Sequence, residues 1–406
     1  MSRPTIRAID YVANDGGGVR FVGELIAAIR QIRPDSRFEI VSSGAALARY
    51  RDALRGIPDI TFSDMPPRRS ARRRLGDLIP FERVRRKVRG AEWEIVVPAR
   101  ALRGADLVWF PWVHRHAAPT GTDVTAVGTL HDVILFQVAG LVDPRTLTRE
   151  RRITASWLSS STPIVVSSRA TITAAASLFG VGPDRFDLVP LTGEHTRTAP
   201  TPLPAEWTWA VRPYLLLPAN TFPHKNHEVA LRARARSSSR LPLVLTGPGS
   251  DLADDGRGRH LRELANQLGL SVGTTGDPDV VPLGLVEAGA YAALLGQAAA
   301  LVMPTRAEGG GSFPVWESVC AGVPVICSDI PVLREQVERM GAEVSFFDPD
   351  DPDALARLID TVVRPGSAET ATAHAQRLHL RSRPWTTVAV EYLAVFDRVA
   401  GSADRR

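Results

Sequence analysis

The chain has 406 residues, of which 44% are hydrophobic, and this is enough apolar material for two independently packed domains. Its two cysteines, Cys320 and Cys327, are too few for a disulfide framework or a zinc site, so we expect both to be buried as small hydrophobic residues. No apolar run reaches the length of about 18 residues that spans a bilayer, and the first residues lack the apolar core of a signal peptide. We therefore expect a cytoplasmic protein.

The formal net charge of +5 is concentrated in one segment. Residues 68–89 contain ten basic and two acidic side chains, a local net charge of +8, with apolar residues interspersed among them. This pattern favours a peripheral contact with the inner face of a membrane or with an anionic acceptor, and a solvated loop is equally compatible with it. Nucleic-acid binding is not expected, because no recognised binding motif or aromatic stacking platform accompanies the charge.

The amino-terminal half alternates short apolar runs with an amphipathic helix. A glycine-rich turn at 16–18 leads into a helix predicted over 19–32, with Val19, Val22, Ile26 and Ile29 on one face. Strands are predicted at 5–12, 38–41, 59–62, 106–110, 124–130 and 163–167. This pattern predicts an α/β domain with a mostly parallel sheet.

A proline- and threonine-rich stretch at 191–213 has no periodicity and is interpreted as a linker. A second set of strands follows it, and the last segment, from residue 385, has a helical pattern. The acidic run 348–353 precedes an amphipathic segment, so we interpret it as a helix cap and not as a metal site. The strands of this second α/β sheet are predicted at 214–217, 243–246, 280–282, 301–303 and 323–327.

Residues 299–331 indicate a strand, a glycine-rich loop, a short helix and a second strand, which together form a parallel βαβ unit. Ligands bind such units at the carboxyl end of the first strand, where a helix amino terminus favours negative charge. Gly309, Gly310 and Gly311 allow a ligand to approach the backbone, and the amides beyond them can hold a diphosphate. Glu308 in the loop is then suited to bind hydroxyl groups, and Glu317, one turn into the helix, to bind a ribose. A diphosphate, a ribose and a polyol together describe a sugar nucleotide.

These residues resemble the donor-site motif of the retaining glycosyltransferases of family 4, in glycosyl transferases group 1. The family motif is two glutamates separated by seven residues, followed by a strand of the form G-x-P-V-[IV]. Here eight residues separate Glu308 from Glu317, so the loop is one residue longer, and the downstream match CAGVPVICSDIPVLRE at 320–335 is close. The resemblance implies the α/β fold called GT-B, with two Rossmann-like domains facing across a cleft. They are an acceptor-side domain at 1–195 and a donor domain at 212–384, with a final helix at 385–406 that crosses back to the first domain.

The resemblance also implies roles for individual residues. Lys225, in the segment ANTFPHKN, matches the lysine that binds the donor diphosphate, although His224 stands where the family often has arginine and no arginine precedes Lys225 within this segment. His131, in GTLHDVI, lies at the end of a strand and matches a histidine near the donor sugar or the reacting centre. A solvated lysine and a histidine paired with the backbone are the structural alternatives. The expected catalytic residues are thus His131, Glu308 and Lys225. The expected donor-binding residues are Gly17, Gly18, Asn226, Gly247, Val286, Gly309, Gly310, Gly311, Ser312, Phe313 and Glu317.

From the sequence we therefore expect a bacterial, retaining hexosyltransferase that needs no metal and no cofactor. Its donor is expected to be a nucleotide diphosphate sugar, with GDP-mannose favoured by resemblance to mannosyltransferase-like members, and its acceptor a sugar or lipid-linked hydroxyl group. Two alternatives share the fold: a non-catalytic protein that binds nucleotide sugars, and a nucleotide-sugar epimerase.

Overall fold

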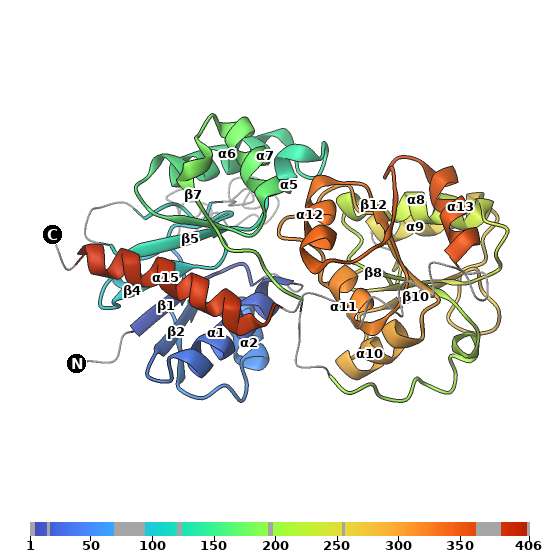
Figure 1. The fold of residues 1–406 in the computed structure, drawn as a ribbon, viewed down its shortest axis with the longest axis horizontal. Coiled ribbons are helices and arrows are strands. Elements are labelled where there is room, and N and C mark those ends of the chain that lie inside the picture. Colours follow the sequence, from blue (N-terminus) through green and yellow to red (C-terminus); the bar gives the residue numbers. More distant parts are fainter. Residues whose placement is uncertain are drawn as a thin grey trace, which may run out of the picture. The chain divides into compact units, whose positions relative to one another are not determined.

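A computed structural model describes residues 5–13, 17–68, 94–119, 124–193, 198–253, 256–362 and 383–403. The chain divides into two compact units (Figure 1). The first contains residues 1–136, 142–191 and 384–406, and the second contains residues 137–141 and 192–383. Most of the basic segment at 68–89 lies outside the described residues, so the structure does not bear on its expected contact with a membrane or an acceptor.

The first unit is built on a parallel sheet of seven strands in the order β3-β2-β1-β4-β5-β6-β7. Neighbouring strands pair in register, as Ile6 with Phe38 and Val108 with Ala126 show. The strands are β1 (Thr5–Ile9), β2 (Arg37–Ser42), β3 (Ile60–Asp64), β4 (Leu107–Phe110), β5 (Ala126–Leu130), β6 (Ile164–Val166) and β7 (Phe186–Leu188).

The helices of the first unit connect these strands. The predicted apolar face of α1 is confirmed, because Val19, Val22, Ile26 and Ile29 are all buried. Asp143 accepts hydrogen bonds from the amides of Arg145 and Thr146 and so caps α6. The helices and short 3₁₀ segments are α1 (Gly17–Ile32), α2 (Gly44–Ala53), η1 (Ala99–Leu102), α5 (Ile134–Gln137), α6 (Pro144–Ser159), α7 (Arg169–Phe179) and η2 (Pro183–Arg185).

The last helix of the chain, α15 (Trp385–Ala403), packs against α1 in the first unit (Figure 1). Tyr392 and Phe396 contact the ring of Trp109 on β4, each with ring centroids 6.0 Å apart. An ion pair of 2.5 Å between Arg33 and Asp397 adds a polar contact at the edge of the interface. The final helix therefore completes the core of the domain that the amino-terminal sequence begins.

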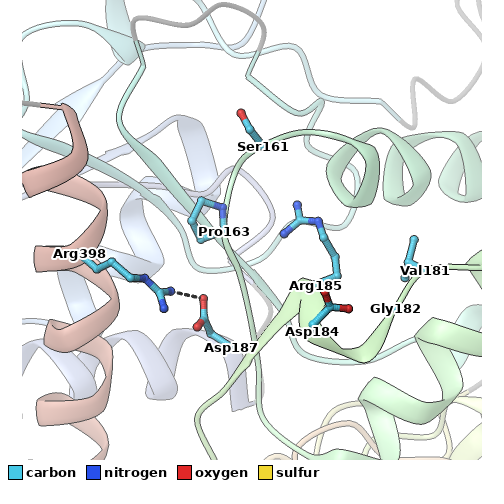
Figure 2. Close-up of a pocket in the computed structure, with 8 residues that line it drawn as sticks. All are labelled: Ser161, Pro163, Val181, Gly182, Asp184, Arg185, Asp187 and Arg398. Carbon is cyan, nitrogen blue, oxygen red and sulfur yellow. Dashed lines mark hydrogen bonds and ion pairs between the residues drawn. The ribbon is translucent and has the colours of Figure 1, made fainter. Parts of the chain in front are cut away.

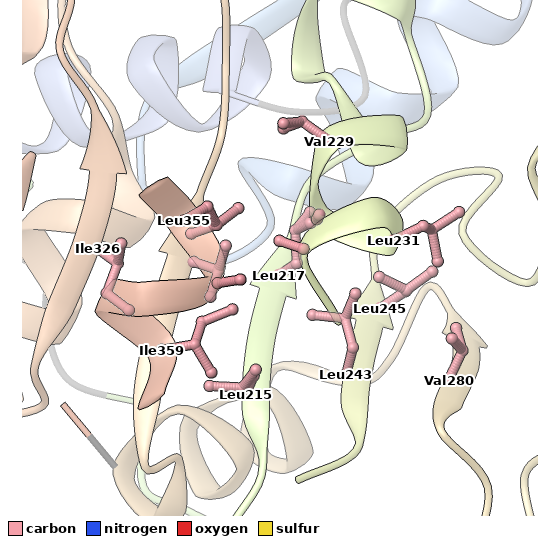
Figure 3. Packing of buried hydrophobic residues seen from close by; sticks show 14 of the residues in the cluster. Leu215, Leu217, Val229, Leu231, Leu243, Leu245, Val280, Ile326, Leu355 and Ile359 are labelled. Atoms are coloured by element: carbon pink, nitrogen blue, oxygen red, sulfur yellow. The ribbon is translucent and has the colours of Figure 1, made fainter. Parts of the chain in front are cut away.

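The second unit is built on a parallel sheet of six strands in the order β10-β9-β8-β11-β12-β13. Leu215, Leu217 and Leu245 on the sheet pack with Val229 and Ile359 from two covering helices, α8 and α13 (Figure 3). The strands are β8 (Leu215–Pro218), β9 (Leu243–Thr246), β10 (Val280–Gly284), β11 (Ala300–Met303), β12 (Val325–Ser328) and β13 (Ser345–Phe347). The helices and 3₁₀ segments are η3 (Thr208–Val211), η4 (Pro223–Lys225), α8 (His227–Arg236), α9 (Gly256–Gln267), α10 (Ala288–Gln297), α11 (Phe313–Ala321), α12 (Pro331–Met340) and α13 (Pro352–Val362).

The acidic run before α13 caps that helix, as the sequence predicts. Asp351 accepts hydrogen bonds of 2.9 Å from the amides of Asp353 and Ala354. Cys327 is buried as expected, whereas Cys320 is only half-buried, and neither forms a disulfide. Burial raises the pKa of the Cys327 thiol far above its ordinary value.

Counted within each unit, the two sheets share one topology. Each places its first strand beside its fourth, which is the doubly wound order 3-2-1-4-5-6, and the first unit adds β7 at one edge. The expected α/β class with two Rossmann-like domains of GT-B type is confirmed. In such sheets ligands bind at the carboxyl ends of the strands, where the strand order reverses. These positions follow β1 and β4 in the first unit, and β8 and β11 in the second.

Candidate functional site

The loops after β8 and β11 bring Lys225 and Glu308 into direct contact. Lys225 lies in η4, directly after the β8 loop, and Glu308 lies in the loop that follows β11. The Lys225 ammonium donates to Oε1 of Glu308 at 2.5 Å, and the two side chains keep 17% and 9% of their surface exposed. Two residues that the sequence assigned separately to the phosphate and the sugar are thus partners in this structure.

Main-chain contacts hold these two loops together. The carbonyl of His224 accepts hydrogen bonds from the amide of Arg306 at 2.7 Å and from the Thr305 hydroxyl at 3.1 Å. Thr305 is completely buried, and its hydroxyl also lies 2.8 Å from the carbonyl of Ala307. Hydrogen bonds between the two loops therefore hold Lys225 and Glu308 near each other, in addition to the contact of their side chains.

Asn226 and His227 carry the chain from η4 into α8. Asn226 has a left-handed backbone with φ of 54°, and its side-chain amide donates to the carbonyl of Pro349 at 2.7 Å. His227 is completely buried. Burial, followed by the positive charges of Arg257 and Lys225, lowers the pKa of His227 to about 3. His227 therefore stays neutral beside these two cations.

The glycine-rich loop ends in the first turn of α11, which begins at Phe313. Gly311 has φ of +110°, a conformation that favours glycine. The amide of Ser312 donates to Oε1 of Gln336 at 2.7 Å. The Ser312 amide, which we expected to help hold a diphosphate, is thus already bonded within the protein. Gly309, Gly310 and Gly311 lie between Glu308 and Ser312.

Glu317 lies on α11, where its carboxylate meets α10. Its Oε2 accepts a hydrogen bond of 2.7 Å from the hydroxyl of Tyr291. Tyr291 therefore orients the carboxylate that the sequence assigned to a ribose. No motif in the sequence marks Tyr291, because its contact with Glu317 depends on how α10 and α11 pack.

Gly247 and Val286 follow β9 and β10. Gly247 has φ of +119°, and a Cβ atom there would lie 2.9 Å from the main chain of Ala219. The close approach of the β8 and β9 loops thus explains this glycine by itself. Val286 is half-buried and packs against an apolar cluster that includes Leu294 and Tyr214. A contact of either residue with a nucleotide stays a prediction.

His131 follows β5 in the first unit, at the carboxyl end of that sheet. Its ring packs against Phe21 at 4.6 Å and Trp112 at 4.9 Å between centroids. Burial lowers the pKa of His131 to about 4, and its Nε2 is a buried atom without a hydrogen-bond partner. His131 is therefore neutral near pH 7 and can accept or donate a hydrogen bond but carries no positive charge. Gly17 and Gly18 begin α1, while residues 14–16 lie outside the described part of the chain.

A buried histidine network, which no motif in the sequence marks, lies beside His131. His114 Nδ1 lies 2.6 Å from Oε1 of Glu150, and its Nε2 lies 2.9 Å from the carbonyl of Asp132. Burial opposes protonation of His114, but hydrogen bonds and charges from Asp132 and Glu150 outweigh it and raise the pKa of His114 well above its ordinary value. His114 thus anchors the main chain next to His131 as a buried cation.

A surface hollow of about 580 Å³ lies at the opposite, amino-terminal ends of β6 and β7 (Figure 2). Arg185 lines it, but its guanidinium donates to the carbonyls of Leu158 and Thr162 at 2.8 and 2.6 Å near the end of α6. Arg398 is paired with Asp187 at 2.5 Å. The charged groups of this hollow thus serve the fold, and we place the candidate site at the carboxyl ends of the strands.

Within the described ranges, no cluster of three or more His, Cys, Asp or Glu side chains could hold a metal ion. In the same part of the chain, none of the helices has the length and apolar character needed to cross a bilayer.

Comparison with known proteins agrees with this architecture. Residues 210–377, within the second unit, match the family model of glycosyl transferases group 1. No curated protein matches the chain in sequence.

Solved structures resemble the chain over nearly its whole length. Sucrose-phosphate synthase from Thermosynechococcus elongatus has a TM-score of 0.66 at 18% identity, with 98% of this chain and 100% of that chain covered. HepE from Anabaena, solved with UDP and glucose, has a TM-score of 0.65 at 14% identity, with 97% and 100% covered. The glycosyltransferase WaaG, involved in lipopolysaccharide biosynthesis, has a TM-score of 0.64 at 15% identity, with 98% and 100% covered. At these identities the likeness defines the fold and not the substrate.

Proposed function

We propose that the chain is a retaining, metal-independent glycosyltransferase that moves a hexose from a nucleoside diphosphate sugar to a hydroxyl group of an acceptor. The observation that carries this proposal is the pair formed by Lys225 and Glu308 at 2.5 Å, at the point where the strand order of the second sheet reverses. The family match of residues 210–377 supports it.

A sugar nucleotide can replace this ion pair with two better-matched contacts. The donor diphosphate takes the place of Glu308 as the partner of Lys225, and the sugar hydroxyls take the place of Lys225 as partners of Glu308. Lys225 then stabilises the negative charge that grows on the diphosphate as the bond to the sugar breaks. Glu317, oriented by Tyr291, binds the ribose hydroxyls.

Transfer on one face of the sugar needs no separate enzymic base. The bond between the anomeric carbon and the phosphate oxygen breaks, the acceptor oxygen bonds to the same face of that carbon, and the departing phosphate takes the acceptor proton. His131, neutral because of its pKa of about 4, can offer a hydrogen bond near the transfer centre without adding charge. We assign this role to His131 as part of the proposal.

The nucleotide and the sugar are to be settled by a donor panel. The sequence favours GDP-mannose, whereas HepE was solved with UDP-glucose. We expect the purified protein to bind one of these two donors with a Kd below about 1 mM in calorimetry and to release the nucleotide slowly without an acceptor. NMR of the glycoside formed with an alcohol acceptor should show that the anomeric configuration of the donor is kept.

Three outcomes would contradict the proposal. Binding without release of nucleotide, with or without acceptor, indicates a non-catalytic nucleotide-sugar-binding protein. Conversion of the donor to an epimer indicates an epimerase. Failure to bind any nucleotide sugar removes the transferase assignment altogether.

We further propose, from charge alone, that residues 68–89 bring the protein to anionic membranes, where a lipid-linked acceptor would be found. Co-sedimentation with phosphatidylglycerol vesicles, but not with phosphatidylcholine vesicles, is expected at low salt and is expected to weaken as salt is raised. Equal recovery with both kinds of vesicle would contradict the membrane contact.

A further inference from the structure

We propose that Gln336 is a positioning residue that fixes the glycine loop of the donor site. Gln336 lies on α12, is only 4% exposed, and uses both polar atoms of its side chain in contacts with Ser312. This inference rests on the proposed function, because it concerns how the same loop is prepared to receive a sugar nucleotide.

Gln336 forms a two-point contact with a single main-chain residue of the loop. Its Oε1 accepts from the amide of Ser312 at 2.7 Å, and its Nε2 donates to the carbonyl of Ser312 at 2.8 Å. Two bonds of opposite direction fix both the position and the rotation of that residue. Ser312 stands at the amino-terminal cap of α11 and its own side chain makes no capping hydrogen bond. Gln336 thus provides from a neighbouring helix a partner for one of the amides that a helix start leaves unpaired.

The residue before Ser312 is adapted to this contact. A Cβ atom on Gly311 would lie 2.7 Å from Oε1 and 2.9 Å from Cδ of Gln336, closer than real atoms pack. Gly311 also has φ of +110°, which other residues rarely adopt. Glycine at 311 and glutamine at 336 therefore depend on each other, and together they seat the loop against α12.

The contact therefore fixes the conformation of the chain between the two carboxylates of the site, Glu308 and Glu317. Glu308 lies four residues before Ser312, and Glu317 lies five residues after it on α11. A loop held at Ser312 keeps Glu308 and Glu317 at a set separation before the donor arrives, so less conformational freedom is lost on binding. Without this contact, ordering of the loop would oppose binding, and donor affinity should fall more than the rate of the chemical step.

The test compares Gln336→Met, which removes both hydrogen bonds at similar volume, with Val337→Ala, which truncates a buried neighbour on the same helix and leaves the contact intact. Calorimetry with UDP-glucose and GDP-mannose, each at pH 8 and pH 6, gives the Kd of the donor that the wild type binds. We expect Gln336→Met to raise this Kd about 10-fold at both pH values, and Val337→Ala to change it less than about 2-fold.

Gln336→Glu supplies a rescue that a purely structural role would not give. As a carboxylate it can still accept from the Ser312 amide but repels the Ser312 carbonyl, and when protonated it can donate to that carbonyl again. Burial raises the pKa of such a carboxyl, so we expect its affinity, relative to the wild type at each pH, to recover between pH 8 and pH 6. Equal losses in Gln336→Met and Val337→Ala, or no loss in Gln336→Met, would overturn the proposal.

Hydrogen exchange without any ligand separates this inference from the proposed function. We expect Gln336→Met to speed exchange in a peptide covering residues 309–313 at least 10-fold relative to Val337→Ala, whether or not the wild type binds a nucleotide sugar. If exchange accelerates and no donor binds, the loop contact stands and the transferase assignment fails. If exchange is unchanged, Gln336 does not hold the loop.

Discussion

The two sheets share a strand order, yet their carboxyl ends carry ionisable groups in opposite ways. In the second unit, Lys225 and Glu308 form a pair that stays partly exposed, at 17% and 9%. In the first unit, Glu150 is completely buried and His114 is held by two carboxyl-bearing residues and a main-chain carbonyl. The same topology thus carries a partly exposed ion pair at one carboxyl edge and a buried, paired histidine and glutamate at the other.

The difference in burial indicates which ion pair a ligand can open and replace with its own contacts. Opening the Lys225–Glu308 pair is less costly than opening a fully buried one, and a ligand that offers both groups new partners offsets the cost. Removing one partner of a buried pair leaves an uncompensated charge and costs several kcal/mol. We therefore expect changes at Lys225 and Glu308 to affect activity, and changes at His114 and Glu150 to affect stability.

The largest expected effect is on activity in the second unit. Lys225→Met and Glu308→Gln should each lower kcat/KM with the donor by about 100-fold or more, because each removes charge or hydrogen bonding from the transition state. Steady-state kinetics with the preferred donor measures this loss. Arg236→Gln breaks an exposed ion pair with Asp353 in the same unit and should leave kcat/KM within about 2-fold. Similar losses of kcat/KM in all three variants would contradict a specific role for the Lys225–Glu308 pair.

The next effect is on stability in the first unit. Glu150→Gln removes the charge that His114 faces and should lower the free energy of unfolding of this unit by about 3 kcal/mol. Urea denaturation can be monitored by hydrogen exchange of residues 107–116, which lie in this unit. Glu94→Gln, which breaks a surface pair with Arg152, is the matched control and should cost under about 1 kcal/mol. A cost for Glu150→Gln as small as that of the control would contradict the buried cation.

His114 and His131 should affect the pH dependence of the first unit's stability in opposite directions. The raised pKa of His114 means that its stabilisation is present below about pH 6.5 and is lost as the pH rises through its folded pKa. The folded pKa of His131, about 4, lies below its unfolded value, so the unfolded state binds the proton first on acidification and stability falls between about pH 6.5 and 4.

His131→Asn should therefore reduce the stability lost by the first unit between pH 7 and pH 5 by about 2 kcal/mol, as measured by urea denaturation at both pH values. His260→Asn, an exposed position in the second unit, should not change that loss. An unaltered acid sensitivity in His131→Asn would show that His131 is not held neutral by burial.

The smallest expected effect concerns the orientation of Glu317. Tyr291→Phe removes one hydrogen bond worth about 1 kcal/mol and should raise the KM for the donor about 5-fold with little change in kcat. Tyr214→Phe removes a similar 2.7 Å bond to the carbonyl of Leu294 in the same unit and should leave KM unchanged. If both variants raise KM equally, Tyr291 acts through general packing and not through Glu317.

The sequence predicts features that depend on local patterns. Strand β11, the glycine loop and the start of α11 follow from an apolar run, three glycines and an apolar helical segment, and the structure has them in that order. The meeting of Lys225 and Glu308 follows from topology, because both lie beyond carboxyl ends of strands that become neighbours. Two edge strands, β7 and β13, were not predicted, since each is three residues long and includes a polar residue (FDL and SFF), whereas β6, equally short, is a continuous apolar run (IVV).

Contacts made by side chains on separate helices could not be read from the sequence. Glu150 reaches His114 from the middle of α6, and Gln336 reaches Ser312 from α12, and neither glutamate nor glutamine stands in a recognisable motif. Only packing brings these partners together. The same cause explains why the amide of Ser312 was expected to be available for a diphosphate.

The placement of α15 has a consequence for how the protein is made. Trp109 and Phe21, from the first part of the chain, are covered by Tyr392 near its end. Tyr392 follows the whole of the second unit in sequence, so this aromatic cluster cannot close until that unit has been synthesised. During that time the amino-terminal part of the first unit keeps the apolar surface around Phe21 and Trp109 uncovered.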